Sequence, residues 1–446
     1  MRAIETIKNI WKIEDLRNRI LITLLLVAIY RFGTFVVLPG IDPQALSALQ
    51  SQTRDGVLAL LDMFSGGAFS NASIFALGIM PYISASIVMQ LMAIVVPSFQ
   101  KMQREGESGR KKINQWTRYL TLIILVFQGW AYLVNLSVQM RSSGIAMPPD
   151  MWFKISSTLI MAGGSMFVLW LGERITDKGI GNGISFIILV GIIARLPQSL
   201  FQEFISRMGD KTGGLVMFLF EMLFLLLVIA GAILLVQGTR KVSVQYAKRI
   251  VGNKQYGGAR QYIPLKVNSA NVMPIIFAQA IMFIPVSIAG FNATGEVSAF
   301  WSAFMDNTGV WYNIVFALMI IAFTYFYTAI TINPTQMADD LKRNNGFIPG
   351  IKPGRATKDY LDEIMSRITL PGAFFLAIVA IMPAFASAAG ISAEFSQFFG
   401  GTSLLILVGV VLDTLQQVES HLLMRHYDGL LKSGRIKGRS GSVAAY

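Results

Sequence analysis

Ten apolar segments, separated by polar stretches, run through the 446 residues of this chain. A helix needs about 20 apolar residues to cross the hydrocarbon layer of a bilayer, which is the approximate length of each segment. Only 14% of the residues are charged, whereas about 25% is usual in soluble domains. The chain is therefore predicted to be an all-α polytopic membrane protein. The predicted spans are residues 20–39, 76–97, 119–138, 154–172, 183–200, 216–237, 270–290, 312–332, 368–387 and 402–423.

Lysine and arginine are distributed unevenly between these segments. The stretch 101–118 carries six of them, whereas the stretch 290–310 carries none. Short loops rich in lysine and arginine remain on the cytoplasmic side of a membrane. Because the basic regions are the two ends of the chain and the even-numbered loops, we expect both termini in the cytoplasm, which agrees with an even number of spans.

The ten spans divide into two groups of five. An odd number of spans per group inverts the second group relative to the first, and inverted repeats place a shared pathway at their interface. The second span of each group contains a proline, Pro81 or Pro274. Matched interruptions point to such a pathway, although prolines are common in membrane helices. We expect an N-terminal half at 1–200, an outer hinge loop at 201–215, a C-terminal half at 216–425 and a basic cytoplasmic tail at 426–446.

The residue types limit the chemistry that this chain can perform. It has no cysteine and two histidines, His421 and His426, which excludes thiolate metal sites and argues against a polar catalytic cluster for a lipid-handling enzyme. Residues 267–295 and 307–338 carry no charge, whereas transporters usually place ionisable groups near the bilayer midplane. The chain also lacks the GxxxxGK[ST] nucleotide-binding loop. We therefore favour a passive channel, with a secondary transporter of small solutes as the alternative.

Two predicted cytoplasmic regions, 238–269 and 333–367, are long, basic and rich in glycine and proline. Within the second, residues 344–364 predict a hairpin tip followed by a short helix. Basic projections of this kind suit docking to an acidic partner such as ribosomal RNA or an acidic protein face. The alternative is that their charge only sets the membrane topology.

A series of stretches resembles the SecY family of bacterial protein-conducting channels, in order and spacing along nearly the whole chain. They are FGTFVVLPGID (32–42), MFSGGAFSNASIFALGIMPYISASI (63–87), QREGESGRKKINQWTRY (103–119), LGERITDKGIGNGISFII (171–188), YAKR (246–249), YIPLKVNSANVMPIIFA (262–278), NPTQMADDLKRNNGFIPGIKPG (333–354) and FGGTSLLILVGVVLD (399–413). The resemblance implies ten helices in two inverted halves, in the bacterial cytoplasmic (inner) membrane. It implies that unfolded polypeptides pass through the protein and that apolar segments leave sideways into lipid, without catalysis, cofactor or metal.

The stretch 63–87 is interrupted by Gly66-Gly67, Asn71, Gly78 and Pro81. In the SecY family the corresponding stretch is re-entrant, which implies a plug at about 64–75 with a short helix from Gly66 to Phe75. We expect its small residues to be loosely packed, as befits an element that is displaced. The implied plug residues are Gly66, Gly67, Ala68, Phe69, Ser70, Asn71, Ala72 and Ser73.

The family's pore constriction is a ring of aliphatic side chains, and every matching position here is isoleucine. Such a ring can close around an extended chain without hydrogen-bonding to any particular sequence, and a narrow apolar constriction blocks ions by dewetting. Without the resemblance, these residues would be read as ordinary core positions. The implied ring is Ile79, Ile83, Ile184, Ile188, Ile276 and Ile406.

The family's lateral gate lies between the second and third spans on one side and the seventh and eighth on the other. The two proline-containing helices would thus be gate helices, and polar side chains on them would hold the closed state by interhelical hydrogen bonds or would simply pack. The implied gate residues are Pro81, Ser84, Ser86, Gln90, Asn271 and Pro274.

The resemblance also assigns partners. The cytoplasmic loops would dock the motor ATPase SecA or the ribosome through Arg240, Lys248, Arg249, Lys352 and Arg355. The family often has arginine at position 352, and lysine there keeps the charge but loses the planar bidentate fork. SecE and SecG would flank the channel, secretory and membrane precursors would be its substrates, SecDF and YidC are further candidate partners, and the lipid bilayer is its surroundings.

Overall fold

The computed structural model describes residues 11, 13–41, 62–142, 151–209, 214–246, 249–251, 254–256, 260–270, 272–279, 281–282 and 309–432. Helices dominate it, as predicted. The helices are α2 (Glu14–Gly33), α5 (Met80–Val95), α6 (Pro97–Arg104), α7 (Glu107–Ser142), α8 (Met151–Lys178), α9 (Gly183–Gly209), α10 (Gly214–Gln237), α13 (Val310–Thr331), α14 (Pro334–Arg343), α15 (Arg355–Ala388), α16 (Ala393–Ser396), the 3₁₀ turn η1 (Gln397–Phe399) and α17 (Gly401–Lys432).

Among the described residues, seven helical stretches are long and apolar enough to cross a membrane, and the bent pair of α5 and α6 makes an eighth. Helix α2 overlaps the predicted first span, 20–39, over residues 20–33. Of the predicted seventh span, 270–290, residues 273–279 and 281–282 are helical and most of the remainder lies outside the described residues. The polytopic all-α architecture is thus confirmed and is consistent with ten spans.

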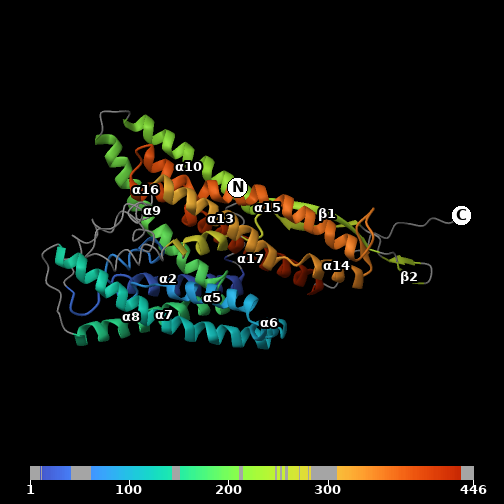
Figure 1. Cartoon of the computed structure of the whole chain (residues 1–446), viewed down its shortest axis with the longest axis horizontal. Helices are drawn as coiled ribbons and strands as arrows, with labels where there is room; N and C mark the ends of the chain where they lie inside the picture. The colour runs from blue at the N-terminus through green and yellow to red at the C-terminus, as the bar shows by residue number, and fades with distance from the viewer. Residues whose placement is uncertain are drawn as a thin grey trace.

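The helices form two groups that meet along α9 (Figure 1). Helices α2, α5, α7 and α8 pack together, and α10, α13, α15 and α17 form the second group. Helix α9 packs against α8 and α2 on one side and against α10 and α17 on the other. Residues 201–209 continue α9, so the first part of the hinge loop predicted at 201–215 is helical and not a loop.

A small β-sheet extends from one end of the bundle, at the right of Figure 1. Strand β1 (Thr239–Tyr246) pairs antiparallel with β4 (Arg260–Lys266) and, at its end, with β5 (Gly346–Phe347). A second pair joins β2 (Arg249–Val251) to β3 (Lys254–Tyr256). The two predicted basic regions therefore form one folded unit, because β5 comes from the second region and pairs with the first.

This sheet has its own apolar core. Val242 and Val244, which alternate along β1, are buried against Leu341, Leu361 and other residues of α14 and α15. The predicted short helix after the tip is instead the first part of the 34-residue α15, which continues into the bundle. The sheet is therefore attached rigidly to a spanning helix.

At the end of the bundle opposite the sheet, a buried ion cluster joins the end of α9 to α10 and to the chain that follows α15. The Arg207 guanidinium lies 2.9 Å from Glu203 and 2.7 Å from Glu221 of α10, and it donates to the Gly390 carbonyl at 2.7 Å. Glu203 also accepts the Ser392 backbone N–H at 3.1 Å. Both carboxylates are only 2% exposed, so one arginine compensates two buried negative charges.

The substitution Arg207→Met is expected to lower the free energy of unfolding by about 3–5 kcal/mol, because removing one partner leaves buried charge uncompensated. Arg118→Met is the matched control. Arg118 pairs with Glu173, whose side chain is 32% exposed, and exposed pairs contribute only about 0–1 kcal/mol. Thermal unfolding of both variants in detergent measures the difference, and equal melting temperatures would contradict the prediction.

Candidate functional site

Residues 62–79, called here the turn segment, enter the N-terminal helix group before α5. Residues 65–79 form consecutive turns, so the short helix expected from Gly66 to Phe75 was wrong. The physical reason lies in the backbone. Gly66, Gly67 and Gly78 have φ of 65°, 92° and 51°, and Ala72 has 43°, a left-handed conformation that regular right-handed helices do not contain.

Two backbone hydrogen bonds attach the turn segment to the chain after α2. The Leu38 N–H donates to the Ala72 carbonyl at 2.9 Å, and the Ile74 N–H donates to the Val36 carbonyl at 3.0 Å. Val37 and Ser73 therefore face each other as an isolated antiparallel bridge. Backbone groups at this depth must be satisfied within the protein, and this bridge satisfies four of them.

Glycines of three helices lie against the turn segment. A Cβ at Gly164 of α8 would lie 2.2 Å from the Ile74 carbonyl oxygen, and one at Gly191 of α9 would lie 2.9 Å from the Phe64 carbonyl oxygen. A Cβ at Gly33 of α2 would meet the Phe75 ring at 2.0 Å. Within the turn segment itself, Ala68, Ala72 and Ser73 are fully buried, so the expectation of loose packing is wrong.

Polar side chains from the surrounding helices bind carbonyls of the turn segment. The Tyr30 hydroxyl donates to Ser65 at 3.1 Å, the Arg31 guanidinium to Gly66 at 2.6 Å and the Tyr132 hydroxyl to Phe69 at 2.8 Å. No role was assigned to Arg31 or to either tyrosine from the sequence. The available signal was a polar side chain inside an apolar helix.

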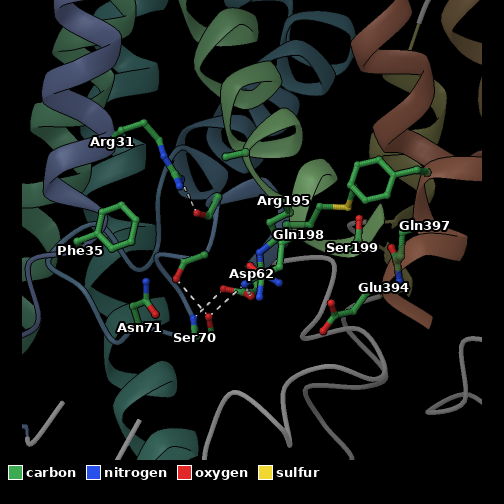
Figure 2. A pocket seen from close by; sticks show the side chains of 15 residues that line it. Arg31, Phe35, Asp62, Ser70, Asn71, Arg195, Gln198, Ser199, Glu394 and Gln397 are labelled. Carbon is green, nitrogen blue, oxygen red and sulfur yellow. Dashed lines mark hydrogen bonds and ion pairs between the residues drawn. The ribbon is translucent and has the colours of Figure 1, made fainter. Parts of the chain in front are cut away.

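An ion pair completes these attachments, and sequence reasoning missed it as well (Figure 2). The Asp62 carboxylate pairs with the Arg195 guanidinium of α9. Its other oxygen accepts the Ser70 backbone N–H at 2.7 Å, and Arg195 donates to the Ser70 hydroxyl at 3.2 Å. The two partners are 133 residues apart in sequence, so no local pattern indicates the pair.

A cavity of about 220 Å³ lies between the turn segment, α9 and the α16–η1 region. Figure 2 shows Arg31, Asp62 and Arg195 at its wall together with Gln198 and Glu394. The lining is mixed: Phe35, Met63 and Phe398 lie beside polar side chains that carry both signs of charge.

The six predicted ring residues are placed as follows. Ile188 and Ile406 belong to one buried apolar cluster, and Ile79 belongs to a second. Ile83 and Ile184 pack against both clusters, so five of the six, which come from α5 and its N-cap, α9 and α17, belong to or pack against these two clusters. Ile276 is half-buried. Their role as a pore ring stays a prediction.

The two predicted gate prolines lie at helix starts. Pro81 occupies the first turn of α5, and Pro274 occupies the first turn of the helical residues 273–279. Proline is favourable in a first turn, where the missing N–H has no intrahelical partner. Gln90 donates to Ser86 of its own helix at 3.4 Å. Ser84 is half-buried, and Asn271 lies outside the described residues.

The predicted docking residues lie at the sheet end of the molecule. Arg240 is exposed on β1, and Lys352 and Arg355 are exposed at the tip and at the start of α15. The backbone of Arg249 belongs to β2, and Lys248 lies outside the described residues. Strand pairing thus brings the two loops together at one end.

Comparisons with known proteins agree with this architecture. The family model described as SecY matches residues 73–415. "Protein translocase subunit SecY" of Thermotoga maritima is 40% identical over 442 residues, covering 98% of this chain and 99% of that protein. The protein of the same description from Thermus thermophilus is 42% identical, covering 97% and 100%.

Solved structures share the fold. "The structure of a protein conducting channel" matches with a TM-score of 0.60 at 15% identity, covering 91% of this chain and 92% of that one. "Sec61 in the Canine ribosome-channel complex from the endoplasmic reticulum" matches with a TM-score of 0.56 at 14% identity, covering 91% and 92%. The family model spans most of this chain, and the bacterial relatives match it over nearly their whole length. The chain therefore belongs to the SecY family.

Proposed function

We propose that this chain is the channel-forming subunit of a bacterial protein translocase. It passes unfolded polypeptides across the cytoplasmic membrane and releases apolar segments into lipid. The observation that carries the proposal is the turn segment: irregular backbone folded among membrane helices and sharing two apolar clusters with five of the six isoleucines. A re-entrant segment of this kind is tolerated only inside protein or beside water, as in a channel whose entrance is filled by its own chain.

In this proposal the turn segment is the plug, and the isoleucines around α5, α9 and α17 are the constriction. Their branched side chains make an apolar ring that fits around an extended polypeptide. The ring has no hydrogen-bonding groups that would retain one particular sequence. Ile276 contributes to the ring from the seventh span. The dewetted ring and the plug together limit ion flow while the channel is idle.

The two helix groups are proposed to act as the two halves, 1–200 and 216–425, which separate slightly on the side opposite their connection at α9 and α10. Pro81, Ser84, Ser86 and Gln90 would line one side of this gate, and Asn271 and Pro274 the other. An apolar signal helix between them would enter lipid because each Leu, Ile, Phe or Val at its centre favours the membrane by about 0.3–0.6 kcal/mol.

The basic sheet end is the proposed docking surface for SecA or the ribosome, through Arg240, Lys248, Arg249, Lys352 and Arg355. Its support is the exposed charge of Arg240, Lys352 and Arg355 on a unit that α15 connects to the bundle. SecE and SecG are proposed as flanking subunits. Energy for transport comes from these partners, and both termini are proposed to lie in the cytoplasm.

Site-directed crosslinking tests the proposal. Because the chain has no cysteine, Ile83→Cys and Ile276→Cys can each be introduced without background, with lipid-facing controls at Phe127→Cys and Leu318→Cys, which are exposed on α7 and α13. A secretory precursor carrying one cysteine is stalled during import into reconstituted vesicles. We expect disulfides at the two isoleucine positions and none at the controls.

The opposite result would overturn the channel. If no position crosslinks, and if uptake of a small solute instead depends on an ion gradient, the protein is a secondary transporter. Crosslinks of equal yield at all four positions would reject the isoleucine ring while retaining a polypeptide substrate.

A further inference from the structure

The Asp62–Arg195 pair differs from the other attachments of the turn segment because both partners are charged. The Asp62 side chain is 2% exposed, whereas Arg195 is 32% exposed and borders the cavity. One carboxylate oxygen is bound by the backbone of the turn segment itself, through Ser70, and the other by α9. A single side chain therefore closes the turn and also fastens it to a spanning helix (Figure 2).

The surroundings make this pair costly to open. A carboxylate that loses its only cationic partner at a buried site retains the cost of its desolvation without compensation. Arg195 has water access through the cavity and can lose its partner with less penalty. Opening is therefore coupled to movement: Asp62 regains solvation only if the turn segment leaves its place among α2, α8 and α9.

The other contacts of the turn segment are not coupled in this way. Tyr30, Arg31 and Tyr132 bind its carbonyls, and a carbonyl that loses such a donor is neutral. The Arg31 guanidinium also lies 5.3 Å from the centre of the Phe35 ring, a contact within α2 and its extension that remains when the segment moves. Asp62 and Arg195 are thus the pair whose state depends most on the position of the segment.

We propose that Asp62 and Arg195 are the electrostatic latch of the closed channel: they are positioning residues that set the fraction of time for which the plug is seated. The inference rests on the proposed function, since it takes the turn segment to be the plug. Neither residue touches the passing polypeptide in this role. Their effect reaches transport only through the plug.

The test uses the complete chain, purified with the subunits that copurify with it and reconstituted in vesicles. Four variants are compared with the unaltered protein: Asp62→Asn, Arg195→Gln, the double variant and the conservative Arg195→Lys. The readout is efflux of a trapped small fluorophore without precursor, that is, leakage of the resting channel. Arg118→Gln is the matched control, because Arg118 of α7 also joins two helices through a carboxylate, at 2.6 Å, but its partner Glu173 belongs to α8 and not to the turn segment.

We expect Asp62→Asn and Arg195→Gln each to raise leakage at least fivefold. The double variant should leak no more than the worse single variant, because residues that act as one pair give non-additive effects. Arg195→Lys keeps the charge and should leak less than half as much as Arg195→Gln. Arg118→Gln should match the unaltered protein.

The melting temperature of each variant separates a latch from a general loss of stability. The latch is wrong if leakage is unchanged in Asp62→Asn and Arg195→Gln, if their effects multiply in the double variant, or if leakage follows the melting temperature across all variants including Arg118→Gln. Precursor crosslinking at Ile83→Cys is measured in parallel. Crosslinking with unchanged leakage would reject the latch alone, whereas its absence in the unaltered background would reject the proposed channel.

Discussion

Oxidation of the double variant Val37→Cys/Ser73→Cys is expected to reduce precursor transport at least tenfold, with full recovery on reduction. These residues are partners in the isolated antiparallel bridge, and the flanking hydrogen bonds at 36–74 and 38–72 make them a non-hydrogen-bonded pair. Such pairs have Cα atoms about 4.5 Å apart, within the range of about 4.4–6.8 Å that a disulfide spans. A disulfide here would hold the plug permanently in its seat.

The experiment has no background from other cysteines of the chain, and it has a matched control. No cysteine occurs in the chain, so mass spectrometry of the oxidised protein reports only the introduced bond. The pair Ser243→Cys/Tyr262→Cys, also antiparallel partners but on strands β1 and β4, shows what a disulfide does away from the plug. Full transport by a completely oxidised Val37→Cys/Ser73→Cys protein would mean that the segment does not move during transport.

The substitution Gly164→Ala is expected to have the opposite effect and to open the resting channel. The new Cβ would lie 2.2 Å from the Ile74 carbonyl oxygen and 3.0 Å from its carbonyl carbon. Both atoms belong to backbone, so a rotamer change cannot relieve the clash. Overpacking of this kind costs about 1–3 kcal/mol, and each 1.4 kcal/mol changes an equilibrium about tenfold. We therefore expect fluorophore leakage about 5- to 100-fold above that of the unaltered protein.

The neighbouring residue supplies the control. A Cβ at Gly163 would have no atom within 4 Å, so Gly163→Ala changes the same helix in the same chemical way without touching the turn segment. Alanine favours a helix by about 1 kcal/mol over glycine, and this variant should be at least as stable and no leakier than the unaltered protein. Equal leakage from both variants would contradict the role assigned to the close approach at Gly164.

The two predictions concern the same equilibrium from opposite sides. The disulfide removes the open state, whereas the alanine at position 164 and the neutral variants of Asp62 and Arg195 raise the free energy of the closed state. A protein in which the disulfide blocks transport and the alanine causes leakage would have a plug that both seals and moves. The packing at Gly33, Gly164 and Gly191 and the latch then determine how long it stays seated.

The membrane architecture could be predicted from the sequence because its cause is local. A bilayer selects for about 20 consecutive apolar residues, and nine of the ten predicted spans overlap described helices, the seventh being described only in part. Helix starts have local causes as well. Asn333 before Pro334 begins α14, and its side chain accepts the N–H groups of Thr335 and Gln336. Such signals involve only neighbouring residues.

The site required tertiary structure because its contacts join distant residues. Composition suggested that the small residues near Gly66 pack loosely, whereas the backbone of Ile74 lies against Gly164, and a glycine in sequence does not reveal which surface approaches it. The pairing of β1 with β5 was likewise hidden, since nothing in either basic region indicated that the two regions pair with each other.

The sequence by itself predicted how many segments can enter the bilayer and to which family the chain is similar, because apolar length and motif order are properties of the chain. The cytoplasmic position of both termini stays a prediction from the distribution of charge. Only the tertiary structure decided that residues 65–79 are turns and that Asp62 meets Arg195. Those outcomes depend on burial, and a carboxylate accepts a particular guanidinium only when folding has removed water from both.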